Sequence, residues 1–145
     1  MASEARKRKM KIPKKLNLAH LPTPLEKIKF QTSRNDRSIK EFLIKRDDYT
    51  GSDFLGNKIR KLEYLLYEAK KEKADIIFTC GGDQSNHARA TASAAAKLGI
   101  KTRLFLWGEE RRISDGNLFL DKMYGADIVY LNKNEFEGVD MLMTE

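Results

Sequence analysis

Two short motifs carry residues that could do chemistry, and in each a strand-like run gives way to a helical pattern. In residues 51–63 a glycine turn leads to Lys58, and in residues 79–89 Ser85 and Asn86 hold the same place. A helix start presents unpaired N–H groups and a partial positive charge, so it suits anionic groups of a ligand. A lysine amine beside such an end can attack a carbonyl. The two motifs together therefore predict chemistry on an aldehyde cofactor.

These residues also have purely structural interpretations. The chain has 28 Lys and Arg residues, and most such side chains are solvated charges. Lys61, one turn after Lys58, is expected to serve the helix surface or an ion pair. Ser85 and Asn86 are of the types preferred as helix caps, a role that is compatible with holding a carboxylate.

Residues 51–58 also come close to the phosphate-binding loop of nucleotide hydrolases. That loop requires a lysine directly after its second glycine, followed by Ser or Thr for magnesium. Here Asn57 separates Gly56 from Lys58, and Ile59 stands where the hydroxyl is needed. The sequence therefore disfavours nucleotide hydrolysis, and binding of labelled ATP would distinguish it from binding of an aldehyde cofactor.

Strand-like and helical patterns alternate along the chain, which predicts crossover units and an α/β fold of three layers with a parallel sheet. Ligands of such sheets bind at the carboxyl ends of the strands, where the loop over residues 81–86 is expected to lie. The predicted strands are 41–45, 75–80, 101–107 and 127–131, after an extended segment at 21–24. The predicted helices are 57–72, 84–98 and 115–124, and a last helix begins within 134–145.

Composition fits one domain with a flexible basic tail. The formal net charge is +7, and residues 1–15 account for +6 of it with seven basic residues and one acidic residue. We expect residues 1–20 to be a flexible segment and predict no specific nucleic-acid partner. A basic-tail adaptor that binds nucleic acid in a salt-sensitive way is the non-enzymatic alternative. No apolar run approaches the length of a membrane span, which predicts no membrane partner.

Cysteine and histidine are scarce. The chain has one cysteine, Cys80, and two histidines, which excludes an internal disulfide framework and predicts a reducing, cytoplasmic location. Cys80 ends an apolar strand and is expected to be a buried, inert thiol. So few ligands of this kind also predict the absence of a metal site.

The two motifs, in this order, resemble the D-cysteine desulfhydrase / 1-aminocyclopropane-1-carboxylate deaminase family, whose members depend on pyridoxal 5′-phosphate (PLP) and have a tryptophan synthase β-like fold. The likeness runs from about Leu21 to about Leu131. The residues that carry it are Lys45-Arg46-Asp47-Asp48, Thr50-Gly51, Gly56-Asn57-Lys58, Arg60-Lys61-Leu62-Glu63 and Gly81-Gly82-Asp83-Gln84-Ser85-Asn86-His87-Ala88-Arg89.

The resemblance implies roles for five residues. Lys58 would hold PLP as a Schiff base, because the resembling enzymes do so at this lysine. Ser85, Asn86 and His87 would surround the substrate carboxylate, with Gln84 beside them. Asn86 would also approach the ring hydroxyl of the cofactor, and Ser85 would act as nucleophile or proton carrier.

The resemblance also implies a reaction on a small amino acid. D-Cysteine would give pyruvate, ammonia and sulfide, and this activity is favoured because His87-Ala88 is closer to the desulfhydrase branch. The alternative is opening of the cyclopropane ring, which would give 2-oxobutanoate and ammonia. Leu55 stands where many members have glycine and is expected to narrow the approach to Lys58.

Resembling enzymes have longer chains, and their downstream half supplies the loop that grips the phosphate of PLP. Residues 21–145 are therefore expected to be the N-terminal part of such an enzyme, comprising most of its smaller domain. We expect this part to be inactive alone, as a truncated fragment would be, and the full-length enzyme to be a homodimer.

Overall fold

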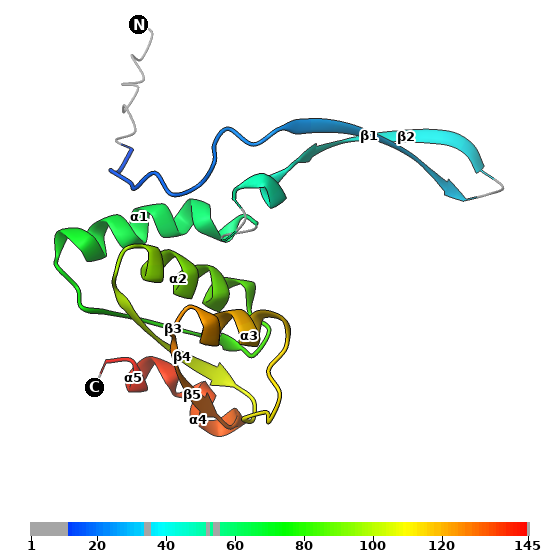
Figure 1. Cartoon of the computed structure of the whole chain (residues 1–145). Helices are drawn as coiled ribbons and strands as arrows, with labels where there is room; N and C mark the ends of the chain where they lie inside the picture. The colour runs from blue at the N-terminus through cyan, green and yellow to red at the C-terminus, as the bar shows by residue number, and fades with distance from the viewer. Residues whose placement is uncertain (1–11, 34–35, 52, 54–55, 145) are drawn as a thin grey trace, which may run out of the picture.

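The computed structural model describes residues 12–33, 36–51, 53 and 56–144. Among these residues, no helix has the length and apolar character needed to cross a membrane. The elements follow along the chain (Figure 1) as β1 (Leu25–Ser33), β2 (Asp36–Lys45), the short 3-10 helix η1 (Asp47–Tyr49), α1 (Lys58–Lys71), β3 (Ile76–Gly82), α2 (Asn86–Lys97), β4 (Lys101–Trp107), α3 (Gly116–Met123), β5 (Asp127–Leu131), α4 (Lys133–Glu137) and α5 (Val139–Leu142).

A parallel sheet in the order β3-β4-β5 forms the centre of the molecule. Each strand is joined to the next by one helix, α2 and then α3, because parallel neighbours need a crossover connection. The register places Gly82 opposite Trp107, and Trp107 opposite Leu131. The carboxyl ends of the three strands therefore share one edge. The predicted α/β fold with a parallel sheet is confirmed.

Helices α2 and α3 cover one face of this sheet. Leu104 and Leu106 of β4 are fully buried and pack with Ala88 of α2 and Leu118 of α3. Phe105, between the two leucines, belongs to the cluster on the other face, as the alternation of side chains along a strand requires. The sheet is thus the middle of three layers.

The other face of the sheet is covered by α4 and α5. Phe105 and Leu131 pack there with Val139 of α5. The single helix expected within residues 134–145 is instead two short helices. Gly138 ends α4 and begins α5. Glycine favours such a break, because a glycine inside a helix loses more conformational entropy than any other residue.

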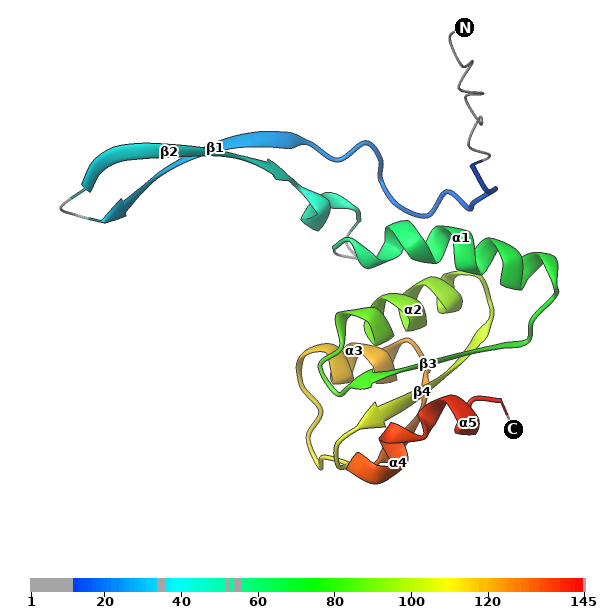
Figure 2. The ribbon, with the colours of Figure 1, turned by 180° about the vertical axis from the view of Figure 1, so that it is seen from behind.

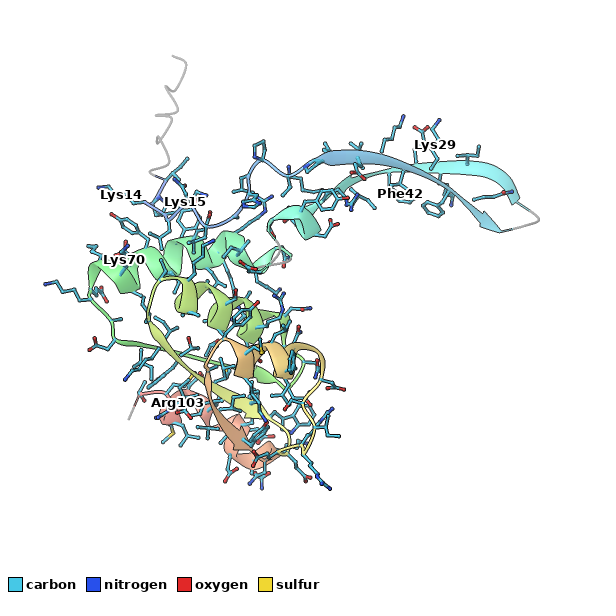
Figure 3. All side chains as sticks on the ribbon, viewed as in Figure 1. Lys14, Lys15, Lys29, Phe42, Lys70 and Arg103 are labelled. Carbon is cyan, nitrogen blue, oxygen red and sulfur yellow. The ribbon has the colours of Figure 1, made fainter. Side chains whose placement is uncertain are left out.

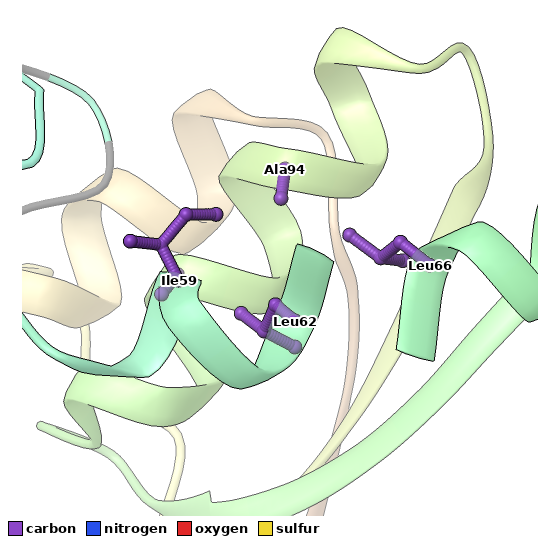
Figure 4. Packing of buried hydrophobic residues seen from close by; sticks show 5 residues of the cluster. Ile59, Leu62, Leu66 and Ala94 are labelled. Carbon is purple, nitrogen blue, oxygen red and sulfur yellow. The ribbon is translucent and has the colours of Figure 1, made fainter. Parts of the chain in front are cut away.

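Helix α1 packs on the outer side of α2. Ile59, Leu62 and Leu66 form a buried cluster with Ala90 and Ala94 (Figure 4). Because α2 presents small alanines to both the sheet and α1, the two neighbours can approach it closely. Burial of each of the three large side chains stabilises the contact by about 1.5–3 kcal/mol before conformational entropy is counted.

The segment before the first strand is bound to α1 from Lys15 onward. The backbone N–H groups of Leu18 and Ala19 donate to Glu63 Oε1 at 2.8 and 2.9 Å, and Lys15 forms an ion pair with the same carboxylate. Burial opposes ionisation of Glu63, but these hydrogen bonds outweigh it and lower its pKa. The sequence predicted a flexible segment over residues 1–20 and did not predict these contacts of Lys15, Leu18 and Ala19. Residues 1–11 lie outside the described part.

Strands β1 and β2 form an antiparallel ribbon that projects away from the parallel sheet (Figures 1 and 2). The sequence predicted a strand over 41–45 and none over 25–33. The observed β2 begins earlier, at Asp36, and β1 was missed because lysine and glutamate interrupt its apolar residues.

The ribbon has one face with a cluster of apolar side chains and one face that mixes apolar and charged residues. Ile28, Phe30, Phe42 and Ile44 share the apolar face, where the rings of Phe30 and Phe42 stack with centroids 4.8 Å apart. These four side chains are between 39% and 48% exposed. Lys29 lies on the opposite face from Phe42 (Figure 3) and pairs with a glutamate of the neighbouring strand.

Candidate functional site

Thr50 holds the loop that leads to Lys58. Its buried hydroxyl donates to the carbonyl of Asp47 at 2.9 Å and accepts from the N–H of Gly56 at 3.2 Å. Gly56 has a φ of +104°, a conformation that side chains rarely allow. The loop closes on itself in this way, and Lys58, half-buried, is the first residue of α1.

Asp47 ties the foot of the ribbon to the first turn of α1. The guanidinium of Arg60 donates to both carboxylate oxygens of Asp47, Nε at 2.8 Å and Nη2 at 2.6 Å. Thr23 Oγ1 donates to the same carboxylate at 3.0 Å. The hydrogen bonds from Arg60 lower the pKa of Asp47 to about 2, against the opposing effect of burial. This part of the first motif therefore positions the helix that begins at Lys58.

The second motif forms the turn between β3 and α2. Ser85 caps α2, because its Oγ accepts from the N–H of Ala88 at 3.2 Å, so the capping interpretation is confirmed. Its own N–H donates to the carbonyl of Gly82 at 2.9 Å. A Cβ at Gly81 would lie 2.7 Å from the side chain of Ser85. The turn can approach β3 this closely only because residue 81 is glycine.

The start of α3 lies against the same turn. Asn117 Nδ2 donates to the carbonyl of Gln84 at 2.8 Å and to Asn86 Oδ1 at 3.1 Å, and its backbone N–H donates to Gln84 Oε1 at 2.9 Å. Gln84 Nε2 in turn donates to Asp115 Oδ1 at 3.2 Å. A side chain at Gly116, whose φ is +51°, would meet Gln84 Oε1 at 2.4 Å. The turn and the helix start therefore form one closely fitted unit.

Lys58 and Asn86 meet at a cavity of about 330 Å³. It lies where α1, α2 and α3 all begin, on the same side of the molecule in Figure 1. Each helix start contributes a partial positive charge. The cavity is lined by Gly56, Asn57, Lys58, Asn86, Arg89, Asn117 and Leu120. None of these described residues carries a carboxylate, so the cavity suits an anionic ligand.

A half-buried imidazole, His87, and a buried carboxylate, Asp121, are the sequence neighbours of two residues that line this cavity. Burial lowers the pKa of His87, and the positive charges of Lys61 and Lys58 add to the effect, so the imidazole is neutral at pH 7. Asp121 of α3 is fully buried, and its carboxylate has no hydrogen-bond partner among the described residues. Burial raises the pKa of Asp121 to about 7, although the charge of Arg89 acts in the opposite direction.

The predicted site residues take different places around this cavity. Lys58 and Asn86 line it, as expected for residues that act on one ligand. Gln84, Ser85 and His87 are outside the described lining: Gln84 bonds to the start of α3, and Ser85 caps α2. The expected effect of Leu55 on the approach to Lys58 concerns a residue outside the described part.

Arg89 and Asn117 line the cavity and were given no role from the sequence. Arg89 ends the second motif and is buried, with its Nη1 donating to the carbonyl of Asp53 at 3.0 Å. Asn117 lies well downstream of both motifs and was covered only by a predicted helix. One signal in the sequence could have indicated Asn117. Residues 101–124 form a third strand–turn–helix unit, and its helix, which begins at Gly116-Asn117, must start at the same edge of the sheet.

A larger hollow, of about 430 Å³, lies at the carboxyl ends of β3 and β4. Its lining includes the acidic residues Asp83, Glu109 and Glu110. Its one described cation, Arg111, is paired with Asp83. This balance is unfavourable for an anion, so the smaller cavity is the better candidate site.

Comparison with known proteins shows the family of this chain. The family described as pyridoxal-phosphate dependent enzyme matches residues 16–145. The chain is similar to the bifunctional D-cysteine desulfhydrase/1-aminocyclopropane-1-carboxylate deaminase, mitochondrial, of Arabidopsis thaliana, with 39% identity over 128 residues, 85% of this chain and 31% of that protein. It is also 39% identical to the D-cysteine desulfhydrase of Klebsiella pneumoniae over 137 residues, 90% of this chain and 41% of that protein.

The likeness extends to solved structures. A crystal structure of an ACC deaminase homologue matches with a TM-score of 0.67 and 37% identity, covering 81% of this chain and 34% of that chain. The chain spans about a third to two-fifths of the length of the curated relatives it matches.

Proposed function

Because this chain belongs to the pyridoxal-phosphate dependent enzyme family, we propose that it provides the lysine-bearing part of an enzyme of the D-cysteine desulfhydrase type. Such an enzyme converts D-cysteine and water into pyruvate, ammonia and hydrogen sulfide. The observation that carries the proposal is the cavity where Lys58 and Asn86 meet at three converging helix starts.

The residues of the cavity fit PLP. The group carries an aldehyde, an anionic phosphate and a ring hydroxyl that loses its proton readily. Lys58 supplies an amine for the aldehyde, and Asn86 and Arg89 supply N–H donors. The three helix starts favour negative charge in the same space. The cavity therefore offers PLP a nucleophile for its aldehyde and N–H donors for its negatively charged oxygens.

PLP, when bound, supplies an electron sink for the electron pair left at the α-carbon of an amino acid. In our proposal Lys58 Nζ is the group that would hold PLP through its aldehyde carbon. As a free amine in the cavity, Lys58 would also be the base that takes the α-proton of the substrate. The N–H groups at the start of α2, with Asn86, hold the substrate carboxylate.

Ser85 and His87 act from the side of this cavity in the proposal. The Oγ of Ser85 accepts the capping hydrogen bond, so its own hydrogen remains available to the substrate carboxylate or the departing sulfur. The neutral state of His87 lets it donate or accept a hydrogen bond without adding charge.

A second candidate is 1-aminocyclopropane-1-carboxylate deaminase. One relative of this chain has both activities in its name, and a solved homologue is named for ACC deaminase. The same lysine and the same carboxylate site would serve both substrates, because both are small α-amino acids. The products distinguish them: sulfide and pyruvate from D-cysteine, 2-oxobutanoate from the cyclopropane.

The proposal is tested by mapping where PLP attaches. The 145-residue protein is incubated with PLP and reduced with borohydride, and its peptides are then analysed by mass spectrometry. We expect the label at Lys58 in preference to other lysines, with a low yield because the chain covers only part of the length of its relatives. The Lys58→Ala variant should lose this label.

Lys133 provides a matched control, because it is also the first residue of a helix, α4. The Lys133→Ala variant should keep the label at Lys58. Labelling spread evenly over many lysines, or a reducible adduct of equal yield in Lys58→Ala, would overturn the proposal.

A further inference from the structure

The amide of Asn117 has a fixed orientation in the unit that joins α3 to the turn of the second motif. Its nitrogen donates to the backbone carbonyl of Gln84 at 2.8 Å. A backbone carbonyl can only accept a hydrogen bond, so the atom of Asn117 that faces it must be Nδ2. The backbone carbonyl therefore decides which end of the Asn117 amide faces the turn.

The fixed amide of Asn117 also determines the orientation of the Asn86 side-chain amide. The second hydrogen of Asn117 Nδ2 goes to Asn86 Oδ1 at 3.1 Å. Because Nδ2 has two hydrogens and no lone pair to offer, Asn86 must present its oxygen and not its nitrogen to Asn117. The remaining polar group of the Asn86 side chain is then its NH₂, and Asn86 lines the cavity that contains Lys58.

The rest of the unit fixes Asn117 itself. Its backbone N–H donates to Gln84 Oε1 at 2.9 Å, and Gln84 Nε2 donates to Asp115 Oδ1 at 3.2 Å. Gly116 leaves no side chain between Gln84 and the helix, where a Cβ would meet Gln84 Oε1 at 2.4 Å. Asn117 is thus held by its own backbone as well as by its side chain.

We infer that Asn117 is a positioning residue, which turns the carboxamide of Asn86 so that its NH₂ group donates into the Lys58 cavity. The group bound opposite Asn86 must then be an acceptor, such as a phenolate or carboxylate oxygen. This use of the donor rests on the proposed function, whereas the orientation rests on the hydrogen bonds alone. Asn117 acts through Asn86, so its loss should weaken ligand binding only while Asn86 is present.

The orientation is tested by NMR of the side-chain amide of Asn86 in the 145-residue protein without ligand. In Asn117→Asp, the carboxylate cannot donate to Asn86 Oδ1 but can accept from Asn86 Nδ2. The Asn86 amide should turn round, and one of its two protons should move downfield and exchange more slowly with water. Asn117→Ala should give no such protection.

Asn134 gives a matched control, because both it and Asn117 are the second residue of a helix. Asn134→Asp adds the same charge at the same helix position and should leave the Asn86 amide unchanged. Asn86 protons that are protected in the parent protein and lose this protection in Asn117→Ala would overturn the inference, since Asn86 would then be the donor. Asn86 signals that do not move in Asn117→Asp would also overturn it.

The consequence for binding is tested by a double-mutant cycle with PLP, read as the concentration that half-saturates labelling of Lys58. Asn117→Ala should raise this concentration by roughly three- to tenfold, the range for one neutral hydrogen bond. In the Asn86→Ala background the same substitution should change it by less than about twofold. An equal effect in both backgrounds would show that Asn117 does not act through Asn86. Absence of any PLP labelling at Lys58 would contradict the proposed function, and the NMR result would still decide the orientation of Asn86.

Discussion

Asp47 shows how much one residue contributes to the position of Lys58. Its carboxylate is held by both nitrogens of the Arg60 fork and by Thr23. Removing this carboxylate leaves the guanidinium of Arg60, in the first turn of α1, without its ion pair and with only the hydrogen bond to Thr23 among the contacts described for it. The charge of Asp47 therefore bears on the stability of the fold and on the direction in which α1 begins.

The low pKa of Asp47 makes this contribution depend on pH. Because the folded protein holds the pKa at about 2, below the ordinary value of 3.8, the stabilisation is complete above about pH 4 and is lost as the pH falls toward 2. We expect Asp47→Asn to lower the free energy of unfolding by roughly 1–2 kcal/mol at pH 7, after allowance for screening by solvent. Urea unfolding at pH 7, 5 and 3 should show the two proteins converging at low pH.

Asp48 is the control for this prediction. It is the neighbouring acid and pairs with Arg46 at the exposed surface, so Asp48→Asn should have the smaller effect. An equal loss in the two variants, or a loss in Asp47→Asn that does not change with pH, would contradict the argument.

The sequence predicted the places of Lys58 and Asn86 at helix starts because each follows a glycine turn with a helical pattern after it. The parallel sheet brings only the turn of Asn86 to the edge where ligands bind; Lys58 follows the antiparallel ribbon, and its place beside Asn86 comes from the packing of α1 on α2. Asn117 could not be found in the same way. Its role comes from hydrogen bonds to residues of a turn that lie 31 and 33 positions earlier, and a single asparagine near a helix start has no spacing that shows such a partner.

At the scale of the elements, the turn between β3 and α2 depends on how closely it can approach the strand. Gly81→Ala would place a Cβ 2.7 Å from the side chain of Ser85, so the cap of α2 must shift. We expect the free energy of unfolding to fall by about 1–3 kcal/mol, as in other overpacked sites, and PLP labelling of Lys58 to weaken. Urea unfolding and the labelling assay measure the two effects.

Gly82→Ala tests whether the effect belongs to this one contact. The neighbouring glycine has nothing within 4 Å of an added Cβ, so its substitution should be nearly neutral. An equal loss of stability in Gly82→Ala and Gly81→Ala would contradict this explanation. It would mean that the turn needs glycine for its backbone conformation and not because a Cβ at residue 81 would contact Ser85.

The packing of α3 against α2 buries the carboxylate of Asp121, and burial of its ionised form lowers the stability of the fold. Its pKa of about 7 lies above the ordinary value of 3.8, so the folded state keeps a proton that the unfolded chain releases. The penalty is absent below about pH 4, grows as the pH rises to 7, and is constant above that. Asp121→Asn should therefore be more stable than the parent at pH 8, by roughly 1–3 kcal/mol, and equal to it at pH 4.

Thermal and urea unfolding at these two pH values check the prediction for Asp121. A variant that is less stable than the parent at pH 8 would show that attraction between Arg89 and the carboxylate outweighs burial.

The strands that the sequence predicted well are those that lie between the two helical layers. In β3, β4 and β5 apolar residues stand next to one another, as in Ile76-Ile77-Phe78, Leu104-Phe105-Leu106 and Ile128-Val129, a pattern typical of parallel sheets. Strand β1 lacks this pattern, because its two faces differ and its lysines and glutamate separate its apolar residues. The helix within 134–145 was extended too far because Gly138 alone was not taken as a stop.

At the scale of the whole molecule, the ribbon is the part that the rest of this chain leaves uncovered. Two strands without further packing are marginally stable in water, and an exposed apolar face promotes association. We expect the 145-residue protein to self-associate as its concentration rises and to bind an apolar dye. Phe42→Lys should reduce both, as measured by analytical ultracentrifugation and by dye fluorescence.

Ile39→Lys is the matched variant, since Ile39 lies on the same strand as Phe42 but on the opposite face of the ribbon. Ile39 takes no part in the stack of Phe30 and Phe42. Its face already carries Lys27, Lys29 and Glu41 beside apolar residues, so the effect should be smaller. Equal reductions in both variants would point to general charge repulsion instead of a specific apolar face.

The ribbon meets the rest of the molecule at a junction where Arg60 donates to Asp47 and the N–H of Gly56 donates to the hydroxyl of Thr50. It extends well beyond the sheet and helices from this junction (Figure 2). In mechanical terms the junction is an anchor point that the ribbon and the start of α1 share. We expect a molecule that binds the ribbon near this point to load the same hydrogen bonds that hold the start of α1.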